Sequence, residues 1–178
     1  MINMEESYQK MREFSRVDAV IPLQVRLICP EERQKIKARI FGEVSFFSAP
    51  VDEPADKALA QWIKLINSKL DYLISLWSLR QEGFCELPLT EVNISGGGMS
   101  FISHVCYSKG DILELKMVLE SPQSIAMFVY GEVVKCERIN NSYKIAVKFI
   151  NIDEDIRDYI VRFVFHRQRQ LIRQKREI

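Results

Sequence analysis

The spacing of apolar residues changes twice along this chain of 178 residues, and each change restricts the fold. From Ile21 to Phe47, apolar and polar residues mostly alternate, as in strands with one buried face. Between Pro54 and Gly83 the apolar residues follow a heptad spacing that is typical of a helix. After Gly83 the alternation returns in short segments separated by turn residues. This order predicts a mainly β fold with added helices (α+β), built on a small antiparallel barrel or sandwich rather than on βαβ units.

The alternating segments predict the individual strands. The first is expected at Ile21 to Cys29, and a second β-rich piece, Ile36 to Phe47, follows a polar turn. Alternation resumes at Phe84 with Cys85, Leu87 and Leu89. Further strands are expected around Met99 and Phe101, and over residues 113–119, 125–136 and 143–150.

A long helix is expected over residues 54–82, inserted between the two β-rich parts. Trp62, Leu65, Ile74 and Leu76 widen its apolar stripe beyond the heptad positions. Two explanations remain open: the helix packs on its own barrel, or it pairs with copies of itself in a homo-oligomer. The heptad positions, which would be the oligomerisation residues, are Leu59, Ile63, Ile66, Leu70, Leu73 and Trp77.

A second helix is expected over residues 153–176. Asp153 is a good N-cap, and the basic residues of the last turns match the helix dipole. These basic residues are either a solvated helix end or a contact for a partner. The face expected to cover the barrel consists of Ile156, Ile160, Phe163 and Val164.

Composition excludes several classes of protein. Apolar residues make up 47% and charged residues 28%, as in a folded domain. The net charge of +1 argues against a general polyanion binder, so no DNA partner is expected. No apolar run is long enough to span a membrane and the N-terminus lacks a signal-peptide core, so a cytoplasmic location is expected. The four scattered cysteines, Cys29, Cys85, Cys106 and Cys136, are expected to be small buried residues without a metal or a disulfide.

Neither a catalytic nor a metal-binding motif is present, so the chain is not expected to be an enzyme. Two other short motifs carry side chains suited to binding a ligand. Arg12 and Arg16 are four residues apart, and their guanidinium groups match phosphate oxygens and the edge of guanine. In Asn93-Ile94-Ser95-Gly96-Gly97-Gly98, the amide and the hydroxyl lie on one side of a strand. The glycines permit positive φ and close approach of a ligand to the backbone. Alternatively, each motif is a surface or turn feature.

Together the two motifs resemble those of the PilZ domain family, R-x-x-x-R followed by [D/N]-x-S-x-x-G. Here they are Arg12 and Arg16, then Asn93, Ser95 and Gly98. Lys109-Gly110-Asp111, Gly131-Glu132-Val133 and the Val147 to Asp153 entry into the last helix also resemble later parts of that family. The helical insert resembles a PilZ subgroup with an added heptad-bearing helix, some members of which self-associate.

The resemblance implies a single PilZ-like domain over residues 1–178, with residues 1–18 as an arginine-bearing arm. It implies a bacterial receptor or adaptor for cyclic di-GMP that changes conformation or partner contacts on binding. Arg12 and Arg16 would grip guanines and phosphates, Asn93 and Ser95 would meet polar groups of the ligand, and Gly98 would leave room. No cofactor other than this ligand is expected, and the downstream protein partner is unknown.

Two other functions remain open at this point. The first is a PilZ-like assembly module whose insert helix is the functional part and whose nucleotide site is weak or vestigial. The second is a small barrel that binds nucleic acid through the arginine-rich last helix, although the near-neutral net charge counts against it.

Overall fold

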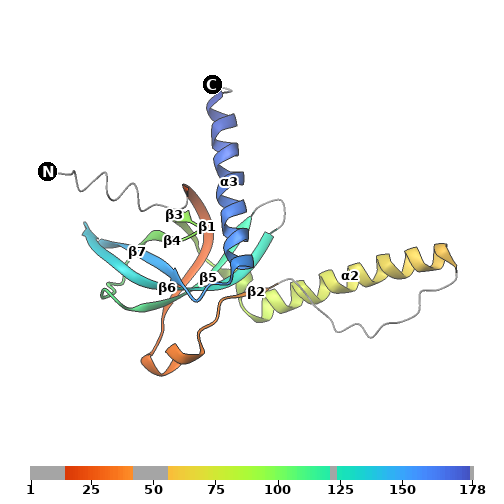
Figure 1. The fold of residues 1–178 in the computed structure, drawn as a ribbon, viewed down its shortest axis with the longest axis horizontal. Coiled ribbons are helices and arrows are strands. Elements are labelled where there is room, and N and C mark those ends of the chain that lie inside the picture. The colour runs from red at the N-terminus through yellow and green to blue at the C-terminus, as the bar shows by residue number, and fades with distance from the viewer. Residues whose placement is uncertain (1–14, 42–55, 121–123, 177–178) are drawn as a thin grey trace.

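The computed structural model describes residues 15–41, 56–120 and 124–176, apart from the side chains of residues 34–35 and 175–176. Its strands form a barrel, from which two helices extend (Figure 1). The strands are β1 (Arg16–Leu27), β2 (Arg39–Phe41), β3 (Leu89–Ser95), β4 (Gly98–Ser103), β5 (Ile112–Glu120), β6 (Ser124–Ile139) and β7 (Ser142–Ile150). The helices are η1 (Pro30–Lys35), α2 (Lys57–Gln81), η2 (Phe84–Glu86) and α3 (Glu154–Arg176).

The sheet is antiparallel and closes on itself. Its strand order is β2-β6-β5-β1-β3-β4-β7, and β6 also pairs with β7. The closure leaves a barrel of six strands, with the short β2 added to β6. A closed barrel leaves few free strand edges, which is how a small antiparallel sheet avoids pairing with other chains. The predicted fold class, an antiparallel barrel with a helical insert and a C-terminal helix, is confirmed.

Alternation along the strands fills the barrel interior. In β1, for example, Val17, Ala19, Ile21 and Leu23 are buried while the residues between them are more exposed. The same period of two operates in β5 and β7. The α3 face predicted from the sequence is also confirmed, because its four residues join the barrel core: Ile156, Ile160, Phe163 and Val164.

Helix α2 extends away from the barrel (Figure 1). Its N-cap is Asp56, whose Oδ1 accepts from the backbone N–H groups of Ala58 at 2.8 Å and Leu59 at 3.4 Å. In the described part of the chain, no residue of α2 is buried. The helix meets the barrel at its C-terminal end, where Leu79 packs against a cluster containing Phe84 and Phe128. Packing of the whole apolar stripe on its own barrel is therefore wrong for this structure.

Three sequence expectations need correction. Residues 84–86 were expected to begin a strand, but they form a short 3-10 helix. Gly83 at φ 68° turns the chain there, and Phe84 buries its ring. The first strand begins at Arg16 rather than Ile21, so residues 16–18 belong to the barrel and not to a free arm. The cysteines are not buried, since Cys29, Cys85 and Cys106 are exposed and Cys136 is half-buried.

Candidate functional site

The strand register brings the residues of the two motifs together. Arg16 at the start of β1 pairs with Ser95 of β3, and Ser95 pairs with Gly98 of β4. Gly98 pairs in turn with Lys148 of β7, so these four residues form one row across four strands. A second row, two residues further along the strands, consists of Asp18, Asn93, Ser100 and Ala146. Residues 75 or more positions apart in sequence thus share one patch of the outer face.

A chain of hydrogen bonds joins the polar members of these rows. The Asn93 side chain donates from Nδ2 to Asp18 Oδ1 over 2.7 Å. Its Oδ1 accepts from Arg16 Nη1 over 3.5 Å, a distance at the limit for a hydrogen bond. Asn93 therefore lies between a carboxylate and a guanidinium group, and these contacts fix the orientation of its amide.

Ser95 and Gly98 close the turn between β3 and β4. Ser95 is buried, and its hydroxyl donates to the carbonyl oxygen of Gly98 over 3.0 Å. Positive φ is not the reason for glycine at position 98, because among described glycines it occurs at Gly83 and Gly110. The reason is close approach of β7: a Cβ at Gly98 would lie 2.3 Å from the carbonyl oxygen of Val147. The sequence-based expectation of a positive φ at Gly98 was therefore wrong.

A shallow hollow, here called the motif hollow, lies on this patch and has a volume of about 390 Å³. Asp18, Asn93 and Ser100 form part of its floor, and Glu91 and Ile102 extend it. Two cationic residues also line it: Lys144 of β7 and Arg167 of α3. Amide, hydroxyl, guanidinium and ammonium groups around one hollow suit a ligand that carries both phosphate oxygens and polar base edges.

The structure brings together four of the five predicted ligand residues: Arg16, Asn93, Ser95 and Gly98. The fifth, Arg12, lies outside the described residues. Sequence reasoning missed Asp18, Lys144, Lys148 and Arg167. Alternation along β7 places Lys144 and Lys148 on the outer face, so their orientation was detectable. Nothing in the sequence indicates that Arg167 reaches the same patch as Asn93.

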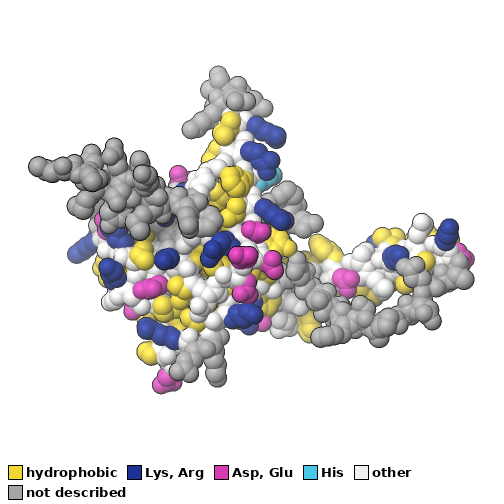
Figure 2. Space-filling view, viewed as in Figure 1, with side chains coloured by type: hydrophobic (Ala, Val, Ile, Leu, Met, Phe, Trp, Pro, Cys, Tyr) yellow, Lys and Arg dark blue, Asp and Glu magenta, His cyan; other side chains and the backbone are white. Residues whose placement is uncertain are grey.

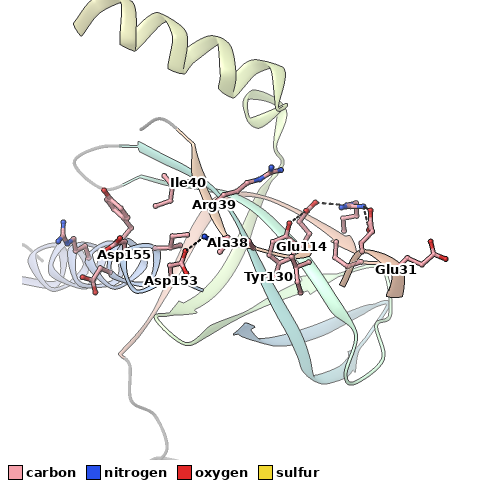
Figure 3. A pocket seen from close by; sticks show the side chains of 17 residues that line it. Glu31, Ala38, Arg39, Ile40, Glu114, Tyr130, Asp153 and Asp155 are labelled. Atoms are coloured by element: carbon pink, nitrogen blue, oxygen red, sulfur yellow. Dashed lines mark hydrogen bonds and ion pairs between the residues drawn. The ribbon is translucent and has the colours of Figure 1, made fainter. Parts of the chain in front are cut away.

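A second, larger hollow of about 1140 Å³ lies between η1, β2 and the start of α3 (Figure 3). Glu114 is central to it: its carboxylate accepts from Tyr130 Oη at 2.9 Å and from Arg26 Nε at 3.1 Å. Arg26 also contacts Glu32 at 3.3 Å. The pKa of Tyr130 is raised to about 12, mainly by burial and secondly by the hydrogen bond to Glu114. The Glu114 hydrogen bond also raises the pKa of Arg26. These mutual contacts tie η1 to the barrel, and no motif residue takes part.

The predicted oligomerisation residues all lie on α2, and all are exposed. Trp62 and Trp77 expose 64% and 65% of their surface, which is unusual for the largest apolar side chain. Figure 2 shows hydrophobic side chains along this helix where it extends from the barrel. The exposed heptad residues are Leu59, Ile63, Ile66, Leu70, Leu73 and Trp77. Among the helices that the structure describes, none has the length and apolarity needed to cross a membrane.

Comparison with known proteins gives one family. The model of the PilZ domain matches residues 78–166, which is half of the chain. No curated protein sequence matches.

Two solved structures share the fold at low sequence identity. One is a pathogenic protein from Xanthomonas campestris, described as a tetrameric PilZ domain self-assembled via an unusual helical bundle. It has a TM-score of 0.58 and 14% identity over 91% of this chain and 92% of its own. The other is the Bacillus subtilis inhibitor of motility, MotI/DgrA, with a TM-score of 0.50 and 14% identity. That match covers 89% of this chain but 52% of MotI/DgrA, so the present chain corresponds to about half of its length.

Proposed function

The chain belongs to the PilZ domain family, a family of cyclic di-GMP receptors, and from this premise we propose that it binds cyclic di-GMP at the motif hollow. PilZ domains are generally binding or adaptor domains rather than enzymes. In this proposal, nucleotide binding changes the surface beside the barrel and thereby its contacts with a downstream protein. In this proposal the protein acts in the cytoplasm.

The observation that carries this proposal is the hydrogen-bonded group of Arg16, Asn93 and Asp18 beside the motif hollow. Arg16 has a fork of donors for phosphate or guanine, and Asn93 has an amide that suits a base edge. Arg12 would add a second guanidinium group from the segment before β1. Lys144 and Lys148 on β7 add positive charge to this face of a chain whose net charge is +1.

Isothermal titration calorimetry with cyclic di-GMP tests the proposal. We expect binding in the micromolar range or tighter, and little heat with GMP or cyclic GMP. Arg12→Ala or Arg16→Ala should each weaken binding by about 2 kcal/mol, the cost of losing a charge-assisted contact. Arg33→Ala is the matched control, because this arginine is exposed in η1 and lines neither hollow. Absence of heat and of a thermal shift with excess nucleotide would reject the proposed function.

We further propose that α2 assembles the protein into a homo-oligomer. Its stripe of exposed leucine, isoleucine and tryptophan side chains, on a helix with no buried residue among those described, supports this proposal. Such a contiguous apolar face is typical of an interaction surface. The heptad spacing specifies a seam that fits an identical helix. The helical bundle of the Xanthomonas protein is a precedent for assembly of this fold.

Analytical ultracentrifugation tests the assembly. Ile66→Glu combined with Leu73→Glu places two charges in the seam, and the variant should sediment as a monomer that still binds nucleotide. Ser68→Glu combined with Ser75→Glu is the control: it has the same charge and spacing, about 200° around the helix from the seam residues. The control should keep the wild-type state. A wild-type protein that is monomeric at tens of micromolar would contradict the proposed assembly.

A further inference from the structure

Helix α3 runs beside the start of β1, where the R-x-x-x-R motif ends. Gln168 of α3 donates from Nε2 to the carbonyl oxygen of Arg16 over 3.0 Å. The same amide group donates to Ser15 Oγ. Ser15 and Arg16 are the last two residues of the arginine motif, and Gln168 follows them by more than 150 positions. A side chain of α3 therefore fixes the backbone that carries the Arg16 guanidinium group.

The preceding residue, Arg167, lies at the motif hollow itself. It is half-buried, and its Nη1 donates to Gln170 Oε1 over 3.0 Å on the same helix. This contact leaves most of the five guanidinium N–H groups for other acceptors. Arg167 thus faces the hollow from α3, whereas Asp18 and Asn93 face it from the barrel strands.

The position of these two residues is fixed by apolar contacts on either side of them. Phe163 and Val164, one turn earlier, belong to the barrel core. Leu171, one turn later, packs partly against the same core. Because buried side chains in a close-packed core permit little displacement, the helix between them holds Arg167 and Gln168 at a defined distance from β1.

The charges around the motif hollow leave a role for Arg167. Asp18 and Glu91 contribute two carboxylates to its lining, which Lys144 and Arg167 balance. A cyclic dinucleotide carries two phosphates and two bases with acceptor edges, so a site needs several donors beyond one or two arginines. A guanidinium group on a rigid helix loses less side-chain freedom on binding than one on a flexible segment.

We propose that α3 forms one wall of the nucleotide site. In this arrangement Arg167 binds a phosphate or guanine acceptor of the ligand, and Gln168 is a positioning residue that holds Arg16. This inference rests on the proposed cyclic di-GMP function and adds to it a helix that neither sequence motif contains. It also gives α3 a direct connection to the bound nucleotide.

Titration calorimetry of the full chain with cyclic di-GMP tests the role of Arg167. Arg167→Ala should weaken binding about tenfold or more, as expected for a lost charge-assisted contact. Arg169→Ala is the control, because Arg169 is exposed on the same helix and does not line the motif hollow. It should change affinity by less than about twofold. Arg167→Gln keeps much of the aliphatic stem and replaces the alanine variant if that one unfolds.

A double-mutant cycle tests Gln168. Gln168→Ala should weaken binding about threefold or more in the wild-type background and have no further effect in the Arg16→Ala background, because it acts through Arg16. A general structural role would weaken binding equally in both backgrounds and would overturn this assignment. If wild type binds and Arg167→Ala matches Arg169→Ala, the α3 wall is wrong while the proposed function stands. If wild type does not bind at all, both are wrong.

Discussion

Gly98 lies where the barrel leaves no room for a side chain. The missing side chain makes room for the carbonyl oxygen of Val147 on β7, 2.3 Å from where a Cβ would lie. Gly98→Ala and Gly98→Val should therefore destabilise the protein by about 1–3 kcal/mol through displacement of β4 from β7. Urea denaturation followed by tryptophan fluorescence or circular dichroism measures this loss. An alanine variant as stable as wild type would show that the strands separate here at no cost.

Tyr130 gives the protein a specific sensitivity to alkaline pH. Its pKa is raised to about 12, above the ordinary value of 10, first by burial and then by Glu114. Below about pH 10 the phenol is protonated in both the folded and the unfolded state, so this group does not change the free energy of unfolding with pH. Between about pH 10 and 12 only the unfolded state loses the proton, so the free energy of unfolding falls as pH rises. Denaturation at a series of pH values should show a steeper loss for wild type than for Tyr130→Phe above pH 10. Parallel curves for the two proteins would contradict this assignment.

The residues of the site were predictable from sequence to the extent that they form local motifs. Arg16, Asn93, Ser95 and Gly98 were identified because their spacing resembles a known family, and the register then placed them in adjacent strands. Arg167 was not predictable, because its proximity depends on how far α3 runs past the barrel. A positive φ at Gly98 was wrongly expected, since the close approach of β7 is a property of strand pairing and not of the turn sequence.

At the scale of elements, the start of α2 depends on its cap. Asp56 satisfies the N–H groups of Ala58 and Leu59, which have no partner within the helix. Asp56→Ala should fray the first turn and cost about 0.5–2 kcal/mol, whereas Asp56→Asn, also a good cap, should cost little. Hydrogen exchange at residues 57–60 measures the fraying directly. Equal exchange in the alanine and asparagine variants would mean that the cap contributes nothing.

The existence of both long helices followed from local periodicity, but the surroundings of α2 did not. The heptad spacing of α2 predicted a helix with one apolar side, and left open what that side contacts. The buried face of α3 was predicted correctly because its four residues have helical spacing next to a strand-rich region. The segment from Phe84 to Glu86 was misread, because a run of three alternating residues is too short to distinguish a strand from a 3-10 turn.

For the whole molecule, the charge distribution predicts how the proposed nucleotide binding would respond to salt. The net charge of +1 conceals an excess of positive charge at one face, where the carboxylates Asp18 and Glu91 are outnumbered by four cationic residues on neighbouring elements: Arg16, Lys144, Lys148 and Arg167. Raising the salt concentration from 50 to 500 mM should therefore weaken cyclic di-GMP binding by about threefold or more. Calorimetric titrations at a series of salt concentrations measure this effect, and Arg16→Ala should reduce the slope. A dissociation constant independent of salt would exclude an electrostatic contribution from this face.

The length of α2 has a consequence for how a partner would sense the nucleotide. Its 25 residues, at 1.5 Å each, span about 37 Å, so barrels joined through this helix would be held apart on a stiff spacer. An oligomer of this kind would present several nucleotide-loaded surfaces to one large target. The affinity for a target bound through two surfaces at once can exceed the affinity through one surface by about 10²–10⁴-fold, because the first contact raises the effective concentration of the second surface. With such avidity, the fraction of target bound would rise more steeply with nucleotide concentration than the fraction of single barrels that hold nucleotide.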